Sequence, residues 1–317
     1  MLSTTDSLRA TSYVFEGGLS STVPPSITSP TNPHIKAVVK LADRRTRDAA
    51  RRTLVEGVRE VRLALAAGVA PVEAYLCPEL IAGPEAEAAA RHLVGLAATG
   101  MTELFYVTPP VFEKLAYRGN SGGLLLVIAY PNPSLDALTF RAAPFVVVVE
   151  EAEKPGNLGA VLRTADAAGV DALIVPTPLE TGFLPRNPVS TAASTGTDPH
   201  NPNVIRASLG AYFTVSTVAA PTDAAIAWLR RQGIAIVATT PAATTLYTAA
   251  DLTGPVAVVM GSEAWGLSET WLAAADVRLR IPMAGQVDSL NLSAATALLL
   301  YEVVRQRQGS GGAGERG

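Results

Sequence analysis

Amide, guanidinium, carboxylate and hydroxyl side chains occur in three glycine-containing stretches of this chain, and such groups bind hydroxyls, amines and phosphates. The first stretch is EKPGNLGAVLRTADAAG, residues 153–169. Its Asn157 can cap a helix, and Arg163 follows six residues later, about 1.7 helical turns away. A capped helix with a solvated arginine explains the stretch as well as a ligand site does. Because the GxGxxG spacing is missing, no dinucleotide fingerprint is present.

The second and third stretches add a carboxylate and two helix-capping residues. In MGSEAWGLSE, residues 260–269, Glu263 lies in a glycine-bracketed turn. It either orients a ligand or is an acidic group favoured at the start of a helix. In IPMAGQVDSLNLSAATALLLYE, residues 281–302, Ser289 and Asn291 precede a strongly apolar run. Helix capping accounts for one of these two residues but not for the whole DSLNLS segment.

Strands must position all three stretches, because each stretch follows an apolar run. The runs in the second half of the chain are 145–150, 172–175, 212–218, 234–239, 256–260 and 277–281. They are continuously apolar, which is typical of parallel strands covered by helices on both faces. Open sheets of this type bind ligands at the carboxyl ends of their strands. A final helix is predicted from Asn291 to Gln308.

The first half of the chain predicts a smaller α/β sandwich. Its long initial helix is predicted over 43–67, because Leu54, Val58, Val61 and Leu65 recur at spacings of three and four. The remaining predicted elements are strands at 72–77, 104–107 and 124–129 and helices at 85–98 and 109–116.

An α/β fold with two domains therefore follows from the pattern. The proline-rich segment near 130–144 breaks the alternation of helices and strands. The predicted organisation is a flexible tail at 1–32, a first domain at 33–131, a linker at 132–143, a second domain at 144–308 and a flexible tail at 309–317.

Composition excludes several classes of protein. With 48% apolar and 17% charged residues in 317, the chain is not a disordered protein, and no apolar run approaches the roughly 20 residues needed to cross a membrane. The single Cys77 cannot form an internal disulfide, and the three histidines share no metal-ligand spacing, so no metal is expected. The N-terminus lacks the pattern of a secretory signal, which favours a cytoplasmic protein.

Positive charge is concentrated in one short segment. The chain carries a net charge of −3, but Lys36–Arg52 has seven basic and two acidic residues, a net +5, which leaves −8 for the remainder. Arg44, Arg47 and Arg51 recur at spacings of three and four, so one helical face is predicted to carry them. Arginine suits bidentate contact with phosphate and stacking on bases, which predicts RNA binding. The alternative is an ordinary solvated helix face.

Taken in order, the polar stretches resemble the SpoU/TrmH family of the SPOUT class, which are RNA ribose 2′-O-methyltransferases. The matching segments are N157-L-G-A-V-L-R163-T-A, V-I-R206-A-S-L-G, G261-S-E-A-W-G266, I281-P-M and S289-L-N-L-S293. The first stretch is especially similar to avilamycin-resistance-type 23S ribosomal RNA methyltransferases.

The resemblance implies an L30e-like RNA-binding first domain and a SPOUT methyltransferase second domain with a deep trefoil knot at about 235–308. It implies a homodimer formed through the methyltransferase domain. It also implies S-adenosylmethionine as cofactor, held largely by main-chain groups. On the matching positions those groups belong to Thr239, Gly261, Ile281 and Leu290.

The family mechanism implies roles for the remaining residues. Because arginine stays protonated, we expect Arg163 to clamp a phosphate and stabilise the forming oxyanion rather than act as a base. A phosphate oxygen or water then takes the proton. Arg206 would be a second phosphate contact, supplied across a dimer interface. The implied organisers of the hydroxyl and the cofactor are Asn157, Glu263, Ser289 and Asn291.

The predicted function is thus S-adenosylmethionine-dependent ribose 2′-O-methylation of RNA, with 23S ribosomal RNA as the substrate. The alternatives are a transfer-RNA methyltransferase of the same family and a non-catalytic RNA-binding or ribosome-assembly factor. A dinucleotide-dependent enzyme is disfavoured by the missing glycine fingerprint.

Overall fold

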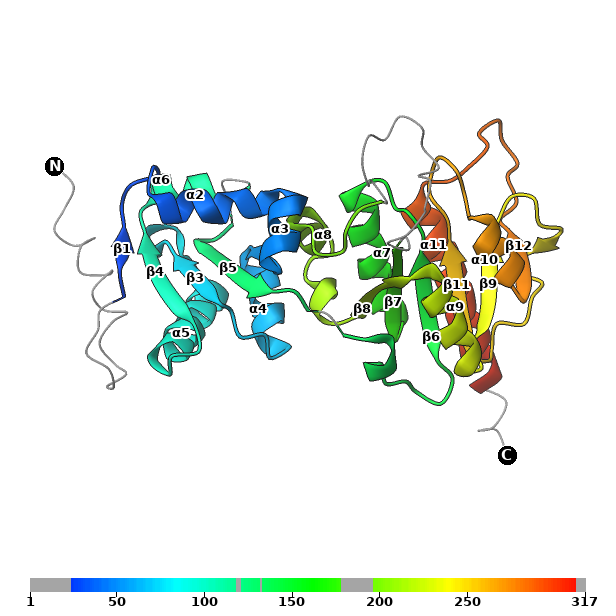
Figure 1. Ribbon diagram of the computed structural model, residues 1–317. Helices are drawn as coiled ribbons and strands as arrows, with labels where there is room; N and C mark the ends of the chain where they lie inside the picture. The colour runs from blue at the N-terminus through cyan, green and yellow to red at the C-terminus, as the bar shows by residue number, and fades with distance from the viewer. Residues whose placement is uncertain (1–23, 118–120, 132, 178–195, 312–317) are drawn as a thin grey trace. The chain divides into compact units, whose positions relative to one another are not determined.

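Two compact units make up the part of the chain that can be described. The computed structural model describes residues 24–117, 121–131, 133–177 and 196–311. One unit holds the described residues up to Tyr130 together with His200–Arg206, and the other holds those of Pro131–Pro199 and those from Ala207 onward. Each unit has its own sheet with helices packed on it (Figure 1). They are called here the N-terminal and the C-terminal unit.

The sheet of the N-terminal unit is mixed and has the strand order β1-β4-β3-β5-β2. Its strands are β1 (Ser26–Ile27), β2 (Arg52–Glu56), β3 (Glu73–Leu76), β4 (Glu103–Val107) and β5 (Leu124–Ala129). Strands β1, β4 and β3 are parallel, and β5 is antiparallel to both of its neighbours. The predicted strands at 72–77, 104–107 and 124–129 are confirmed.

Helices cover both faces of this sheet. They are α2 (Pro33–Val39), the short 3₁₀ helix η1 (Lys40–Ala42), α3 (Arg44–Ala50), α4 (Val58–Ala66), α5 (Pro84–Ala98) and α6 (Pro109–Leu115). Helix α8 (Pro202–Ala207) belongs to this unit up to Arg206. Ile35 of α2 and Phe112 of α6 pack with Tyr75 of β3 in one buried cluster. Helices α4 and α5 pack together on the opposite face (Figure 1).

The single helix predicted over 43–67 is wrong. Arg51 adopts the left-handed conformation with φ of 52° and ends α3, and strand β2 follows at once. Thr53 and Val55 of β2 are β-branched and fully buried, which favours a strand there. Gly57, with φ of 103°, then allows the turn into α4. The helical spacing of Leu54 with Val58, Val61 and Leu65 is a coincidence, because Leu54 lies in β2 and the other three lie in α4.

Both predicted tails are shorter than expected. Ser26 and Ile27 of β1 pair with Tyr106 and Val107, so residues 24–32 do not form a tail. At the other end, α11 (Leu292–Gly311) continues beyond the predicted limit at 308. The remainder of each predicted tail, 1–23 and 312–317, lies outside the described residues.

The sheet of the C-terminal unit consists of parallel strands in the order β10-β12-β9-β11-β6-β7-β8. The strands are β6 (Phe145–Val149), β7 (Ala172–Thr177), β8 (Ser216–Pro221), β9 (Ala235–Thr239), β10 (Thr245–Leu246), β11 (Val256–Met260) and β12 (Val277–Arg280). Five of the predicted strands are confirmed closely. The one predicted at 212–218 starts late, because Ala211–Phe213 forms a 3₁₀ helix.

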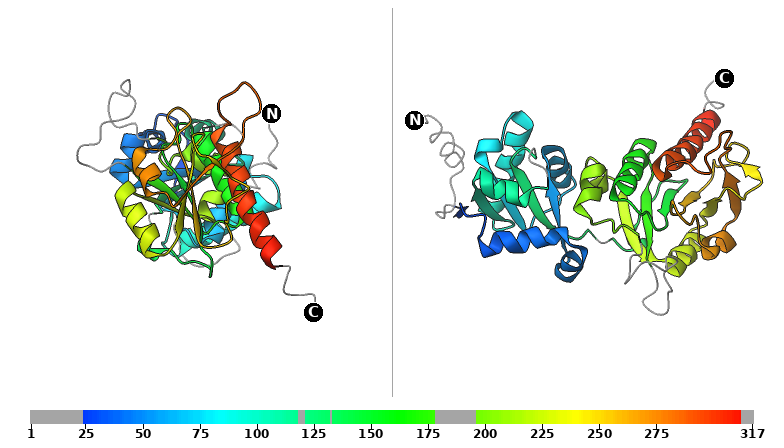
Figure 2. Two further views of the ribbon diagram at one scale, coloured as in Figure 1. Left: turned by 90° about the vertical axis from the view of Figure 1, so that its right-hand side faces the viewer. Right: turned by 90° about the horizontal axis from the view of Figure 1, so that it is seen from above.

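Helices α7 (Pro155–Ala168) and α11 pack against each other on one face of this sheet (Figures 1 and 2). Helices α9 (Thr222–Arg231) and α10 (Glu269–Ala274) pack on the other, where Trp228 and Trp271 are buried. Phe140, in the predicted linker 132–143, lies with its ring 5.5 Å from that of Trp228. Part of that linker therefore belongs to this core. No helix in the described parts of the chain has the length and apolar character that a membrane crossing needs.

Candidate active site

Hydrogen bonds connect the three polar stretches at the carboxyl ends of the parallel strands. The side-chain amide of Asn157, on α7 after β6, donates to the carboxylate of Glu263, which follows β11. The amide of Asn291, which precedes α11, donates to Oδ1 of Asn157 over 3.1 Å. We call Asn157, Glu263 and Asn291 the strand-end network. Residues separated by more than 100 positions thus meet, as the sequence predicted.

Further hydrogen bonds hold the outer members of the network. The second carboxylate oxygen of Glu263 accepts the backbone N–H of Glu153 over 3.2 Å. Oδ1 of Asn291 accepts the backbone N–H of Ser293 at 3.0 Å and its hydroxyl at 2.6 Å, so Asn291 also caps α11. Ser289 is exposed and lies outside this network.

A tight loop fixes Glu263. Ser262 and Gly266 exchange backbone hydrogen bonds of 3.2 and 3.0 Å, so residues 263–265 form the turn between them. Gly266 has φ of 65°, and a Cβ on Gly261 would lie 2.2 Å from the carbonyl carbon of Gly266. Both positions therefore require glycine. The two glycines that bracket Glu263 in the sequence are thus needed for the turn itself to fold.

Glu150, directly after β6, is a site-supporting residue that sequence reasoning missed. Its buried carboxylate accepts the backbone N–H of Ser268 over 2.7 Å, and its own N–H donates to the carbonyl of Met260. These bonds tie the end of β6 to the far side of the Glu263 loop. The feature of the sequence that could have indicated this role is the acidic residue at the end of an otherwise apolar run.

Arg163 is not part of the strand-end network. Helix α7 begins at Pro155, so Asn157 lies in its first turn, and Arg163 lies about 9 Å further along the axis and about 120° around it. The arginine is exposed and has no ion pair within the described part of the chain. Its charge is therefore available to an anionic ligand.

The residues predicted to hold S-adenosylmethionine come from neighbouring strands. Thr239 ends β9 and pairs with Leu279 of β12, while β11, on the other side of β9, leads into Gly261. Ile281 follows β12 directly, and the segment 281–291 has no regular secondary structure.

These residues suit a polar ligand held by the main chain. The Thr239 hydroxyl is buried and has no hydrogen-bond partner among the described residues, so it can serve a ligand atom. The side chain of Leu290 is 39% exposed, next to Asn291 of the network. Irregular backbone after a strand leaves main-chain groups for a ligand, so the residues present fit S-adenosylmethionine.

Arg206 lies in the N-terminal unit and is already engaged there. Its guanidinium forms an ion pair with Glu56 at 3.3 Å and donates to Oδ1 of Asn203 at 2.9 Å. The ring of Tyr117 lies 4.7 Å from its guanidinium carbon. A phosphate at this position would have to compete with the Glu56 carboxylate.

The predicted arginine face of 44–51 needs one correction. Arg47 is 1% exposed, and its guanidinium donates to the carbonyls of Leu41 and Ala42 at the end of η1. Placing it on an exposed face was wrong, because α3 packs on η1 and needs its charge at those carbonyls. Arg44 is exposed and pairs with Asp48 at 3.5 Å; Arg51 is exposed too.

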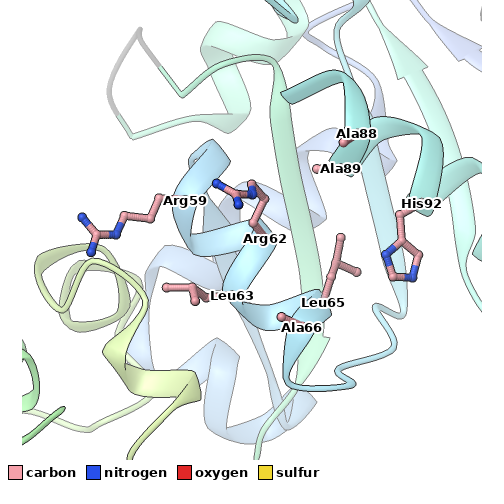
Figure 3. Close-up of a pocket in the computed structure, with 8 residues that line it drawn as sticks. All are labelled: Arg59, Arg62, Leu63, Leu65, Ala66, Ala88, Ala89 and His92. Atoms are coloured by element: carbon pink, nitrogen blue, oxygen red, sulfur yellow. The ribbon is translucent and has the colours of Figure 1, made fainter. Parts of the chain in front are cut away.

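A second basic feature of the N-terminal unit went unnoticed in the sequence. A cavity of about 430 Å³ lies between α4 and α5, with Arg59, Arg62 and His92 on its wall (Figure 3). Arg62 forms an ion pair with Glu85 at 2.6 Å. The signal was the spacing of Arg59 and Arg62, which places them nearly one turn apart on α4.

Two further kinds of site were considered among the described residues: a metal site and a reactive thiol. No group of three or more histidine, cysteine, aspartate or glutamate side chains comes together there to hold a metal ion. Burial and the neighbouring Glu79 raise the pKa of the Cys77 thiol to about 12, so this buried thiol is not a nucleophile at neutral pH.

The fold is that of a methyltransferase of the SPOUT class. Residues 144–301 match the SpoU rRNA Methylase family, and residues 32–126 match the MRM3-like substrate binding domain. The chain belongs to the SpoU rRNA methylase family. It is an S-adenosylmethionine-dependent RNA methyltransferase, as predicted.

Three relatives illustrate the similarity. The 23S rRNA (uridine(2479)-2′-O)-methyltransferase of Streptomyces viridochromogenes is 30% identical over 84% of this chain and 87% of its own length. The 23S rRNA (guanosine-2′-O-)-methyltransferase RlmB of Vibrio parahaemolyticus is 38% identical over 63% of this chain and 77% of its own. The AdoMet-bound rRNA methyltransferase of Sinorhizobium meliloti has a TM-score of 0.75 and 30% identity, covering 88% and 97% of the two chains.

Proposed function

We propose that this enzyme methylates a ribose 2′-hydroxyl of 23S ribosomal RNA. The strand-end network carries the proposal, because it brings together Asn157, Glu263 and Asn291 from the three motifs of the family. The names of the Streptomyces and Vibrio relatives support the ribosomal substrate.

The network orients a hydroxyl rather than deprotonating it. Both oxygens of Glu263 already accept hydrogen bonds, one from Asn157 and one from the backbone N–H of Glu153. Glu263 therefore acts as a positioning residue for the Asn157 amide. That amide has a second N–H, which can hold the ribose oxygen in line. Ser289, exposed two residues before Asn291, is proposed to contact the same substrate region.

Arg163 supplies the positive charge. When bound, S-adenosylmethionine provides an electrophilic methyl group on a sulfonium. As the ribose oxygen attacks, negative charge develops on it, and the exposed guanidinium of Arg163 stabilises that charge and clamps the adjacent phosphate. A phosphate oxygen or water accepts the proton, because the guanidinium remains protonated throughout.

The cofactor is held by the ends of neighbouring strands. We assign its main-chain contacts to Thr239, Gly261, Ile281 and Leu290. The buried hydroxyl of Thr239, which lacks a partner among the described residues, supports this assignment. So does the irregular backbone of 281–291, which joins β12 to α11.

The family's knot and dimer complete the proposal. The chain from 235 to 308 would form the trefoil knot, in keeping with the return of α11 to pack on α7. A homodimer through this domain is supported by an exposed apolar surface beside a cavity of about 630 Å³. The large exposed side chains that line it are Leu290, Leu298 and Tyr301.

The N-terminal unit would bind the RNA. We assign residues 33–131 to an L30e-like RNA-binding domain and 144–308 to catalysis, except for 200–206, which belong to the N-terminal unit. Arg44, Arg51 and Arg206 are proposed RNA contacts. A ribosomal substrate favours a cytoplasmic location.

Methyl transfer to defined RNAs tests the function. The purified chain is incubated with S-adenosylmethionine labelled in its methyl group and with transcripts of 23S ribosomal RNA or transfer RNA, and the RNA is digested to nucleosides. We expect label in 2′-O-methyl nucleosides from 23S RNA. If only transfer RNA is labelled, the substrate is transfer RNA and not 23S ribosomal RNA. Cofactor binding without label in either RNA would favour a non-catalytic RNA-binding factor.

A further inference from the structure

The loop that carries Glu263 also exposes a tryptophan. The chain has three tryptophans, of which Trp228 and Trp271 are 1% and 0% exposed. Trp265 is 54% exposed, although it is the largest apolar side chain available. An indole exposed to this extent offers a flat apolar face and an N–H donor to a ligand.

The backbone around Trp265 is rigid. Its N–H donates to the hydroxyl of Ser262 over 3.0 Å, inside the turn closed by Ser262 and Gly266. After the turn, Leu267 is buried, and the backbone N–H of Ser268 is held by Glu150. The backbone that carries the indole is therefore fixed relative to the strand-end network before any ligand arrives, which lowers the entropy cost of binding.

We propose that Trp265 stacks on the nucleobase of the nucleotide whose ribose is methylated. This inference rests on the proposed function. Trp265 is two residues from Glu263, so their Cα atoms are within about 7 Å of each other. A ribose held at the network carries its base on a single glycosidic bond, within reach of such a ring. Bases of unpaired RNA are recognised largely by stacking on aromatic side chains.

The surroundings favour a base over other apolar ligands. Each oxygen of the neighbouring Glu263 already accepts one hydrogen bond, from Asn157 or from Glu153, which makes this carboxylate a weaker partner for a cationic peptide. Ala264 is exposed and small, which leaves space next to the indole for a flat ring. The rival ligand is the adenine of the cofactor, and the test distinguishes the two.

Fluorescence measures the stacking directly. Because Trp228 and Trp271 are buried, Trp265 accounts for the long-wavelength emission that acrylamide quenches in the full-length protein. We expect a 23S RNA fragment that the enzyme methylates to quench this emission and protect it from acrylamide. The Trp265→Phe variant should lose the response. Quenching by S-adenosylmethionine alone, or a blue-shifted emission that shows Trp265 already covered in the free protein, would overturn the proposal.

Variant kinetics complete the test. Trp265→Ala should lower kcat/KM for RNA about 10- to 100-fold, whereas Trp265→Phe should retain most activity because it keeps a stacking ring. Calorimetry should show unchanged S-adenosylmethionine affinity in both. Thr270→Ala, at an exposed position of α10 outside the proposed site, is the control and should behave like the wild type. If the wild type methylates RNA and Trp265→Ala is equally active, the stacking role fails while the function stands; an inactive wild type would defeat the function itself.

Discussion

The strand-end network and the arginine segment at 44–51 use polar side chains in opposite ways. Arg47 gives its hydrogen bonds to carbonyls of its own segment and is buried. Asn157 exchanges its hydrogen bonds with side chains that come from other strand ends, at a partly exposed edge. The partners distinguish the roles: local main-chain partners indicate folding, and convergent side-chain partners indicate a site. Variants of the two regions should therefore affect different properties.

The largest expected effect is the loss of methyl-transfer rate when Arg163 is replaced. Arg163→Ala should lower the transfer rate about 1000-fold, because the forming oxyanion loses its positive partner. Arg163→Lys keeps the charge and should retain measurable activity. Single-turnover transfer with saturating cofactor gives both rates, and calorimetry provides the control for cofactor binding. Equal total loss in both variants, with intact binding, would contradict the charge-clamp role.

A smaller effect is expected from Glu263→Gln. This change keeps the shape of the side chain but replaces one acceptor oxygen by a donor, so the amide of Asn157 or the N–H of Glu153 loses its partner. We expect a rate about 100-fold lower with a free energy of unfolding within about 1 kcal/mol of the wild type. Denaturant melts and transfer rates measure the two quantities. A large loss of stability would assign Glu263 to folding instead.

The reverse pattern is expected for Arg47. Arg47→Met should lower the free energy of unfolding by about 1–3 kcal/mol, because the carbonyls of Leu41 and Ala42 lose a charged donor. Arg44→Met, on the exposed side of the same helix, should change it by less than about 0.5 kcal/mol. Urea unfolding compares the pair. Similar costs for both would contradict the structural role of Arg47.

Charge reversal at the exposed arginines should change the affinity for RNA and leave cofactor binding and stability unchanged. Combining Arg44→Glu with Arg51→Glu should weaken RNA affinity about tenfold at physiological salt and flatten its salt dependence. Cofactor affinity and the melting temperature are the controls. Unchanged RNA affinity would show that these arginines only keep the surface solvated.

The smallest effect depends on pH. Arg305 and Gln306 donate to the buried carboxylate of Glu302, and the bonds from Arg305 lower its pKa below the ordinary value near 4.5. A lowered pKa stabilises the fold above the unfolded value and loses that contribution as pH falls through the folded value. Glu302→Gln should therefore cost about 1 kcal/mol at pH 7 and progressively less below about pH 4. A pH-independent difference between the melting temperatures of the two proteins would contradict this.

The parallel sheet could be predicted from the sequence because buried parallel strands give continuous apolar runs, as in FVVVV of β6. The convergence of Asn157, Glu263 and Asn291 followed from their places after such strands. The arginine face was wrong for a physical reason: spacing tells which side chains share a helical face but not whether a neighbour covers one of them, and Arg47 of α3 packs against η1. Glu150 was missed because the sequence does not show which backbone N–H will donate to an acidic residue at the end of a strand.

The central claim is that Asn157 and Glu263 act as one unit in ribose methylation. Single-turnover transfer to the 2′-oxygen of 23S RNA, with saturating S-adenosylmethionine, tests it in a double-mutant cycle of Asn157→Ala and Glu263→Gln. We expect the double variant to be no slower than Asn157→Ala alone, since Glu263 works through that amide. Rate losses that multiply independently would contradict it.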